Sequence, residues 1–267
     1  MVVSAELLNG SVSRGGEIFT RVTLMTSAKS TVRADWSELV ALNFHCDQQT
    51  LGPLVPPGLE LDYFNDDTFL SLIAVRLKEV YVWNLPFAIG HEVDLVSLRF
   101  YVRRMEKGLP KERGVCLIKS FVSSRMAAWS LSRALKSPFE FAPFAIENSG
   151  FSVVGGREET PTVDYRWRAD HEQNRIRVKA RQRVGKISED SIIGFLLQRG
   201  YWYAGSGSRT VAFSAQSGNW KVWDAGQASF TCDARSLFGS QFSKYITRRP
   251  ASVFLAERSP VSLSAVK

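Results

Sequence analysis

Long stretches of strict alternation between polar and apolar side chains constrain the fold of this 267-residue chain more than any other feature. Between residues 94 and 104 one set of positions carries polar or amphipathic side chains and the intervening set is apolar: Ser97, Arg99, Tyr101 and Arg103 against Val96, Leu98, Phe100 and Val102. A period of two places the two sets on opposite faces of an extended strand, whereas a helix repeats every 3.6 residues. The alternation therefore predicts a β-rich fold.

Further strands are predicted from short apolar or alternating runs bounded by Gly, Pro, Asn and Asp: 39–44, 59–63, 68–83, 114–122, 163–184 (a hairpin turning near 170–174), 201–203, 211–213, 220–223 and 253–255. We expect 59–63 to form a hairpin with 68–83, and 94–104 to pair with 114–122. Helical signals are a turn after Asp47, a helix from Ser124 to about Leu135, and a helix after Ser188 that ends at Gly200. These elements predict an α+β fold, mainly antiparallel β, with two or three flanking helices.

The chain offers no boundary that would divide it into two domains. Residues 1–33, rich in Ser, Thr and Gly, are predicted to be a partly disordered N-terminal extension, and residues 34–267 a single domain. The best apolar run, residues 70–75, has the length of a strand, so no membrane span is expected. Three cysteines and three histidines are too scattered for a metal site, and sparse cysteines favour a reducing compartment. We therefore expect a cytoplasmic protein without metal or cofactor.

One segment concentrates positive charge in a chain whose net charge is +8. Five cations occupy every second position of a predicted strand: Arg175, Arg177, Lys179, Arg181 and Arg183. The segment is interpreted either as the solvated face of an antiparallel sheet or as a cationic surface for phosphates, RNA or another anionic partner. The absence of interleaved aromatic residues favours the solvated face over nucleic-acid binding.

The alternation also selects candidate pocket residues. Arg99 and Tyr101 share a strand face, and inside a barrel they would bind a carboxylate, Arg99 as a two-pronged donor and Tyr101 as a single donor. Alternation further predicts that Lys119 shares a face with Val115, Leu117 and Phe121. Such a lysine is either a desolvated nucleophile or a side chain whose charge reaches water.

Glu60 and Asp62 form the last candidate pair, two carboxylates on one face of a short strand. They are interpreted either as a general acid/base pair or as a water-facing pair at a strand end. The surrounding turn residues favour the water-facing interpretation.

Several motifs together resemble the YqjF-like family of uncharacterised conserved bacterial proteins, over about residues 33–265. They are Trp36–Leu39, Asn43-Phe44, Leu51–Asp62, Leu98–Arg103, Gly114-Val115, Phe195-Leu196, Arg199–Tyr203, Trp220 and Pro250–Glu257. The resemblance implies an acetoacetate decarboxylase-like fold, a β-barrel or cone with outer helices and a pocket within. The chain departs from the family pattern at Leu95 and Ser97, where members tend to have an acidic residue and an asparagine, and at Ser217, where a histidine is frequent.

The decarboxylase mechanism of that fold uses two adjacent lysines, one of which forms a Schiff base. No two lysines are adjacent in this chain, and Lys119 is displaced from the matching positions, so this mechanism is not carried over. The leading hypothesis is a protein that binds a small anionic organic molecule in a barrel pocket through Arg99 and Tyr101, with Asp62 and Trp220 as further ligand-binding candidates. The alternatives are a lysine-dependent enzyme using Lys119, and binding of nucleic acid or an acidic partner through the 175–183 strand.

Overall fold

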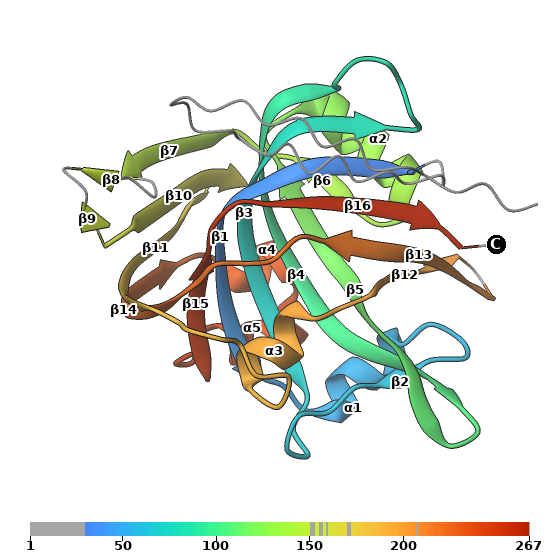
Figure 1. Cartoon of the computed structure of the whole chain (residues 1–267). Helices are drawn as coiled ribbons and strands as arrows, with labels where there is room; N and C mark the ends of the chain where they lie inside the picture. Colours follow the sequence, from blue (N-terminus) through green and yellow to red (C-terminus); the bar gives the residue numbers. More distant parts are fainter. Residues whose placement is uncertain are drawn as a thin grey trace, which may run out of the picture.

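Strand β1 (Val32–His45) organises the molecule, because it divides one of its edges between two partners (Figure 1). Its first part pairs with β16 (Ser259–Ala265) and its second part with β15 (Ser252–Ala256), while its other edge pairs with β3 (Phe69–Val82). The computed structural model describes residues 30–149, 153–154, 157–158, 160–169, 172–206 and 208–266.

The pairing of β1 with β16 closes a barrel whose strands follow the order β16-β13-β12-β5-β4-β3-β1. The remaining barrel strands are β4 (Gly90–Glu106), β5 (Leu109–Val122), β12 (Tyr201–Ser206) and β13 (Arg209–Ser217). Neighbouring barrel strands are antiparallel except for β5 and β12, which are parallel. Closure pairs the edges of these strands and encloses a space that side chains fill.

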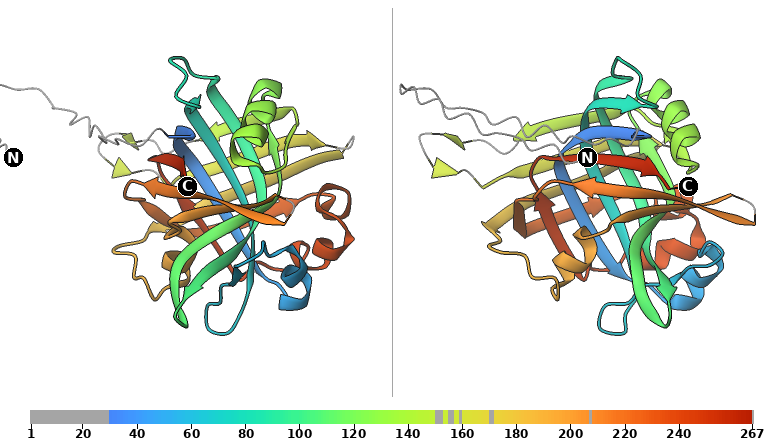
Figure 2. Two further views of the ribbon diagram at one scale, coloured as in Figure 1. Left: turned by 90° about the vertical axis from the view of Figure 1, so that its right-hand side faces the viewer. Right: turned by 45° about the vertical axis from the view of Figure 1, so that its right-hand side comes forward.

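The pairing of β1 with β15 instead leads into an outer sheet that packs beside the barrel (Figures 1 and 2). Beyond β15 it continues through β14 (Val222–Thr231), β11 (Glu172–Arg183), β10 (Thr162–Ala169) and β7 (Phe144–Ser149). Shorter strands complete the description: β2 (Glu60–Leu61) on β4, β6 (Phe139–Phe141) on β5, and the pair β8 (Val153–Val154) and β9 (Arg157–Glu158).

Short helices flank the strands: α1 (Gln48–Leu51), a 3-10 turn (Gly52–Leu54), α2 (Arg125–Leu135), α3 (Ile192–Leu197), α4 (Ala234–Phe238) and α5 (Ser240–Ile246). Ser124 caps α2 as predicted, because its hydroxyl accepts a hydrogen bond from the backbone N–H of Ala127. The cap of α3 is Ser191 rather than Ser188. Helices α2 and α3 lie toward opposite ends of the barrel (Figure 1).

Two separate hydrophobic cores follow from the alternation along the shared strands. The inner core fills the barrel and includes Ala41, Ile73, Tyr101, Trp202 and Leu263, together with apolar residues of α2 and α3. The outer core includes Leu42, Leu72, Phe100, Ile176 and Phe242 and lies between the barrel wall, the outer sheet, α4 and α5. Residues of β4 on the same face as Tyr101 therefore point into the barrel.

The structure confirms the predicted fold class, and the hairpin of β10 and β11 and the pair of β4 and β5 are where they were expected. The predicted hairpin of 59–63 with 68–83 is wrong, because β2 pairs with β4. Most of the predicted N-terminal extension, residues 1–29, lies outside the described residues, and β1 begins at Val32. Within the described part of the chain, no helix is long and apolar enough to cross a membrane.

Candidate functional site

Arg99 is a buried cation inside the barrel. It lies on β4 opposite Ser71 of β3 and Leu117 of β5, and the residue is 7% exposed. Among the described residues it has no hydrogen-bond acceptor and no carboxylate partner, and its Nε atom is fully buried. A charge removed from water costs free energy unless it is paired. Arg99 is thus the charge that most clearly lacks its counter-ion.

Tyr101 is held by a chain of hydrogen bonds that links neighbouring strands of the barrel wall. Ser71 Oγ donates to Asn43 Oδ1 at 2.6 Å, and the Asn43 amide nitrogen donates to Ser252. Because a serine hydroxyl has one hydrogen, the 2.7 Å contact between Tyr101 and Ser71 is donated by Tyr101. In this arrangement the Tyr101 hydroxyl hydrogen is not available to a ligand, contrary to the donor role expected from the sequence, and its ring remains as a wall of the site.

Arg199, which sequence reasoning did not single out for the site, contributes a second buried guanidinium. It follows α3, its side chain is 5% exposed, and Nη1 donates to Asp62 while Nε and Nη2 find no acceptor in the described structure. Its Cζ atom lies 3.9 Å from the ring centroid of Phe195 and 4.8 Å from that of Tyr101. Burial lowers the pKa of the Arg199 guanidinium below its usual value, and the charge of Asp62 opposes this shift.

Asp62 provides the carboxylate of this cluster. Its side chain is fully buried, accepts from the backbone N–H of Tyr63 at 3.1 Å, and lies 3.7 Å from Arg113 Nε. Glu60, by contrast, is exposed and pairs with Arg103 at 3.5 Å. The water-facing interpretation therefore fits Glu60 and is wrong for Asp62, because the chain after β2 stays on β4 through a backbone hydrogen bond from Asp62 to Tyr101 and carries Asp62 inward.

Lys119 does not join this site, because a β-bulge changes its face. The register of β4 and β5 shifts between Leu98, which pairs with Lys119, and Arg99, which pairs with Leu117. The extra residue, Ile118, places Lys119 on the outer face with Leu98, whereas Leu117 stays on the inner face. There Lys119 Nζ pairs with Glu140 of β6 at 3.1 Å. The predicted shared face of Lys119 with Val115 and Leu117 is wrong.

Trp220 lies between β13 and β14, half-buried against the inner core. Within the described residues, no ring contact or hydrogen bond joins it to Arg99 or Arg199. The structure thus brings together Arg99, Tyr101 and Asp62, and leaves Lys119 and Trp220 apart from them.

The basic strand forms one face of the outer sheet. Arg177, Lys179, Arg181 and Arg183 are exposed and Arg175 is half-buried, whereas Ile176, Val178 and Ala180 face the outer core. The arginines are not all free: Asp164, buried on β10, binds Arg175 and lies near Arg166 and Arg177, and Asp224 of β14 binds Arg181. Burial raises the pKa of Asp164, but the hydrogen bonds and charges of Arg175 and Arg166 outweigh it, so the pKa is lowered overall.

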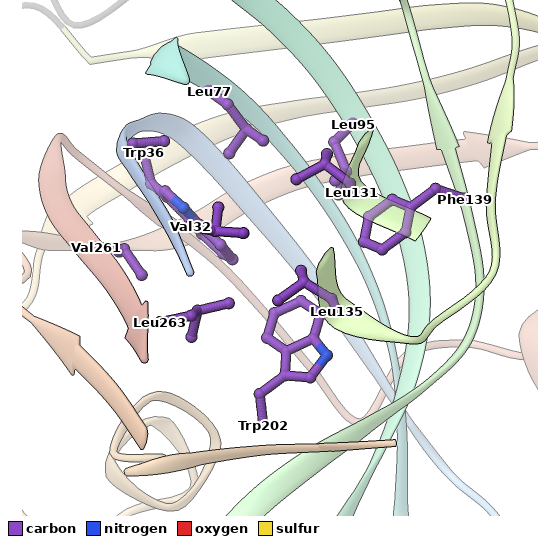
Figure 3. Close-up of a pocket in the computed structure, with 11 residues that line it drawn as sticks. Val32, Trp36, Leu77, Leu95, Leu131, Leu135, Phe139, Trp202, Val261 and Leu263 are labelled. Atoms are coloured by element: carbon purple, nitrogen blue, oxygen red, sulfur yellow. The ribbon is translucent and has the colours of Figure 1, made fainter. Parts of the chain in front are cut away.

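Two cavities differ in size and chemistry. An apolar cavity inside the barrel lies against α2, where Leu131 and Leu135 face Leu95 and Trp202 (Figure 3). It leaves about 20 Å³ free, room for little more than one water molecule. A groove of about 500 Å³ lies outside the barrel between β1, β14 and the segment after α5, with Arg248 and Arg249 exposed at its rim. Its volume suits a ligand, but neither arginine is buried, so Arg99 remains the stronger indication of a binding site.

The chain matches one family model over residues 33–260, that of DUF2071, described as "Uncharacterized conserved protein (COG2071)". No curated protein matches it.

Solved structures with the same fold include acetoacetate decarboxylases and an enzyme of enduracididine biosynthesis. An acetoacetate decarboxylase-like enzyme from Sphingomonas wittichii RW1 is similar with a TM-score of 0.58 and 14% identity, over 89% of this chain and 94% of that one. Acetoacetate decarboxylase from Legionella pneumophila has a TM-score of 0.57 and 11% identity, over 97% and 98%. The enduracididine biosynthesis enzyme MppR, complexed with pyruvate, has a TM-score of 0.58 and 10% identity, over 90% and 91%. The family match and the shared barrel confirm the resemblance seen in the sequence: the chain belongs to the DUF2071 family of uncharacterised conserved proteins and has an acetoacetate decarboxylase-like fold.

Proposed function

We propose that this protein binds a small anionic organic molecule inside its barrel, with the anionic group at Arg99. The observation that carries the proposal is the burial of Arg99 without a counter-ion among the described residues. A folded chain tolerates such a charge where a ligand supplies the missing partner, and a guanidinium matches the two oxygens of a carboxylate.

Two neighbouring features support a carboxylate as that partner. Arg199 adds a second buried guanidinium with unpaired nitrogens against the same Tyr101 ring. In addition, a structural neighbour at 10% identity was solved in complex with pyruvate, which is a small carboxylate. Tyr101, against whose ring both guanidinium groups lie, belongs to the buried inner core, where charge-assisted hydrogen bonds are stronger than in water.

The test is a screen of small carboxylates by thermal shift, followed by calorimetric titration of every hit. Arg99→Met keeps the length of the side chain and removes its charge, so we expect it to bind the hits at least about tenfold more weakly, the value of one hydrogen bond to a charged group. Arg104→Met is the matched control, because Arg104 lies on the same strand and already pairs with Glu112 at 3.3 Å. Equal affinity of wild type and Arg99→Met would remove the proposed role of Arg99.

A further inference from the structure

The buried charges of the barrel do not balance. Arg99, Arg199 and Asp62 have side chains almost removed from solvent, and they place two positive charges and one negative charge inside. Two other arginines lie nearby, but Arg103 is paired with Glu60, and the side chain of Arg113 is 48% exposed. Solvent screens the charges at this rim, so the interior is left with one uncompensated positive charge.

The position of Asp62 decides which arginine it neutralises. One oxygen of Asp62 accepts from Arg199 Nη1, and its second oxygen accepts from the backbone N–H of Tyr63, so both carboxylate oxygens are engaged. Within the described structure Arg199 keeps Nε and Nη2 unpaired, and Arg99 keeps its fully buried Nε unpaired. Both groups lie against the Tyr101 ring, with Cζ to centroid distances of 4.8 and 5.9 Å.

From this charge balance we infer that the site selects a monocarboxylate over dianions, and that Asp62 sets this selectivity by neutralising Arg199. The inference rests on the proposed function and specifies its ligand class. One carboxylate would accept hydrogen bonds from Arg99 and from the free nitrogens of Arg199, and the rest of the ligand would be uncharged, since it faces the apolar inner core. A second anionic group would meet Asp62 in a medium of low dielectric constant, where like charges repel strongly.

Matched pairs of ligands test the selectivity directly. Butanoate against succinate, and hexanoate against adipate, compare one and two carboxylates at equal carbon number, and the measured quantity is the ratio of the two affinities by calorimetry. Wild type is expected to prefer the monocarboxylate. Asp62→Asn keeps the shape and adds one net positive charge to the interior, so the ratio is expected to shift toward the dicarboxylate by about tenfold or more.

Two further variants separate charge from structure. The double variant Asp62→Asn with Arg199→Gln restores the wild-type net charge and is expected to restore the preference for the monocarboxylate, although with lower affinity. Glu140→Gln removes an exposed carboxylate that pairs with Lys119 on the outer face, and it is expected to leave the ratio unchanged. If Asp62→Asn fails to fold, Arg199→Gln alone replaces it in the series. In Arg199→Gln the charges of Arg99 and Asp62 cancel, whereas the double variant keeps the positive charge of Arg99. Arg199→Gln is therefore expected to bind monocarboxylates at least about tenfold more weakly than the double variant.

The outcomes distinguish the two proposals. The selectivity inference is overturned if carboxylates bind but Asp62→Asn leaves the affinity ratio unchanged. It is also overturned if the wild type prefers dicarboxylates. In both cases the proposed function stands. If no carboxylate binds wild type at all, the proposed function fails and the inference fails with it.

Discussion

At the scale of single residues, the buried and unpaired guanidinium of Arg99 is expected to lower the stability of the unliganded protein. Arg99→Met removes the charge and fills a similar volume in the inner core, so we expect it to raise the free energy of unfolding by about 1–3 kcal/mol, the cost of an unsatisfied buried polar group. Urea denaturation of both proteins without ligand measures the difference. A less stable Arg99→Met would show that Arg99 already has a partner in the unliganded protein.

The same scale gives an expectation for Lys119. Because Lys119 lies on the outer face and pairs with Glu140, we expect no Schiff base there. Borohydride trapping with pyruvate and with acetoacetate, followed by peptide mass spectrometry, checks this, and Lys119→Gln controls for labelling at other lysines. A reduced adduct confined to Lys119 would instead revive the lysine-dependent enzyme.

Residue-level prediction from the sequence succeeded where a strand is regular. Period two placed Arg99 and Tyr101 on one face because β4 keeps its register with β5 from Arg99 to Tyr101. It failed for Lys119 because one extra residue in β5 reverses every face beyond it, and a bulge leaves no mark in the alternation itself. Arg199 was missed because its partner Asp62 is 137 residues away in sequence. The only local signal was a lone arginine among the apolar and aromatic residues 195–203.

At the scale of elements, Asp164 joins β10 to the basic face of β11. Its pKa is lowered in the folded protein by Arg175 and Arg166 despite burial, so its contribution to stability is present above the unfolded carboxyl pKa of about 3.9 and is lost as the pH falls through the lower native value. We expect Asp164→Asn to cost about 1–3 kcal/mol at pH 7 and progressively less below about pH 4. Chemical denaturation across this pH range measures the cost.

Asp66→Asn is the matched control for that series, because Asp66 is exposed in a turn where asparagine also fits. A cost of Asp164→Asn that stays constant down to pH 2 would contradict the ion-pair account.

Element prediction was best for units defined by near neighbours in sequence. The hairpins and α2 are specified by local alternation, turn residues and the Ser124 cap. Helices α4 and α5 were not predicted because each is only one or two turns long and no start or stop signal was recognised beside it. Helix α3 is as short, but the acidic residues before it and Gly200 after it marked its position. The partner of β2 was wrong because a two-residue strand carries almost no pairing information of its own.

At the scale of the whole molecule, the cysteines report on global opening. Burial raises the pKa of the Cys116 thiol well above its usual value and raises that of Cys46 to about 12, so thiolate is scarce in the folded protein at neutral pH. We expect iodoacetamide to label Cys116 only through unfolding, with the same urea dependence as the global transition. Pulsed alkylation with mass spectrometry measures this, and labelling of Cys116 without denaturant, at the rate of the unfolded chain, would contradict it.

The whole architecture could be anticipated only in outline. The sequence motifs implied a barrel with a pocket, and the barrel is present. The division of β1 between β15 and β16 could not be anticipated, because it depends on pairings with segments more than 200 residues away.

Because of that division, β1 is a strand shared by the barrel and the outer sheet. On one side of its backbone Ala41 and Asn43 belong to the barrel interior, and on the other Leu42 and Phe44 line the outer groove. Only the backbone of β1 separates the barrel interior from the outer groove, so a displacement of β1 changes both. The side chain of Asn43, which begins the hydrogen-bond chain to Tyr101, points to the interior side. A ligand that displaces β1 from the groove side would therefore also displace Asn43 inside the barrel. Binding to the groove and binding inside the barrel are best measured together.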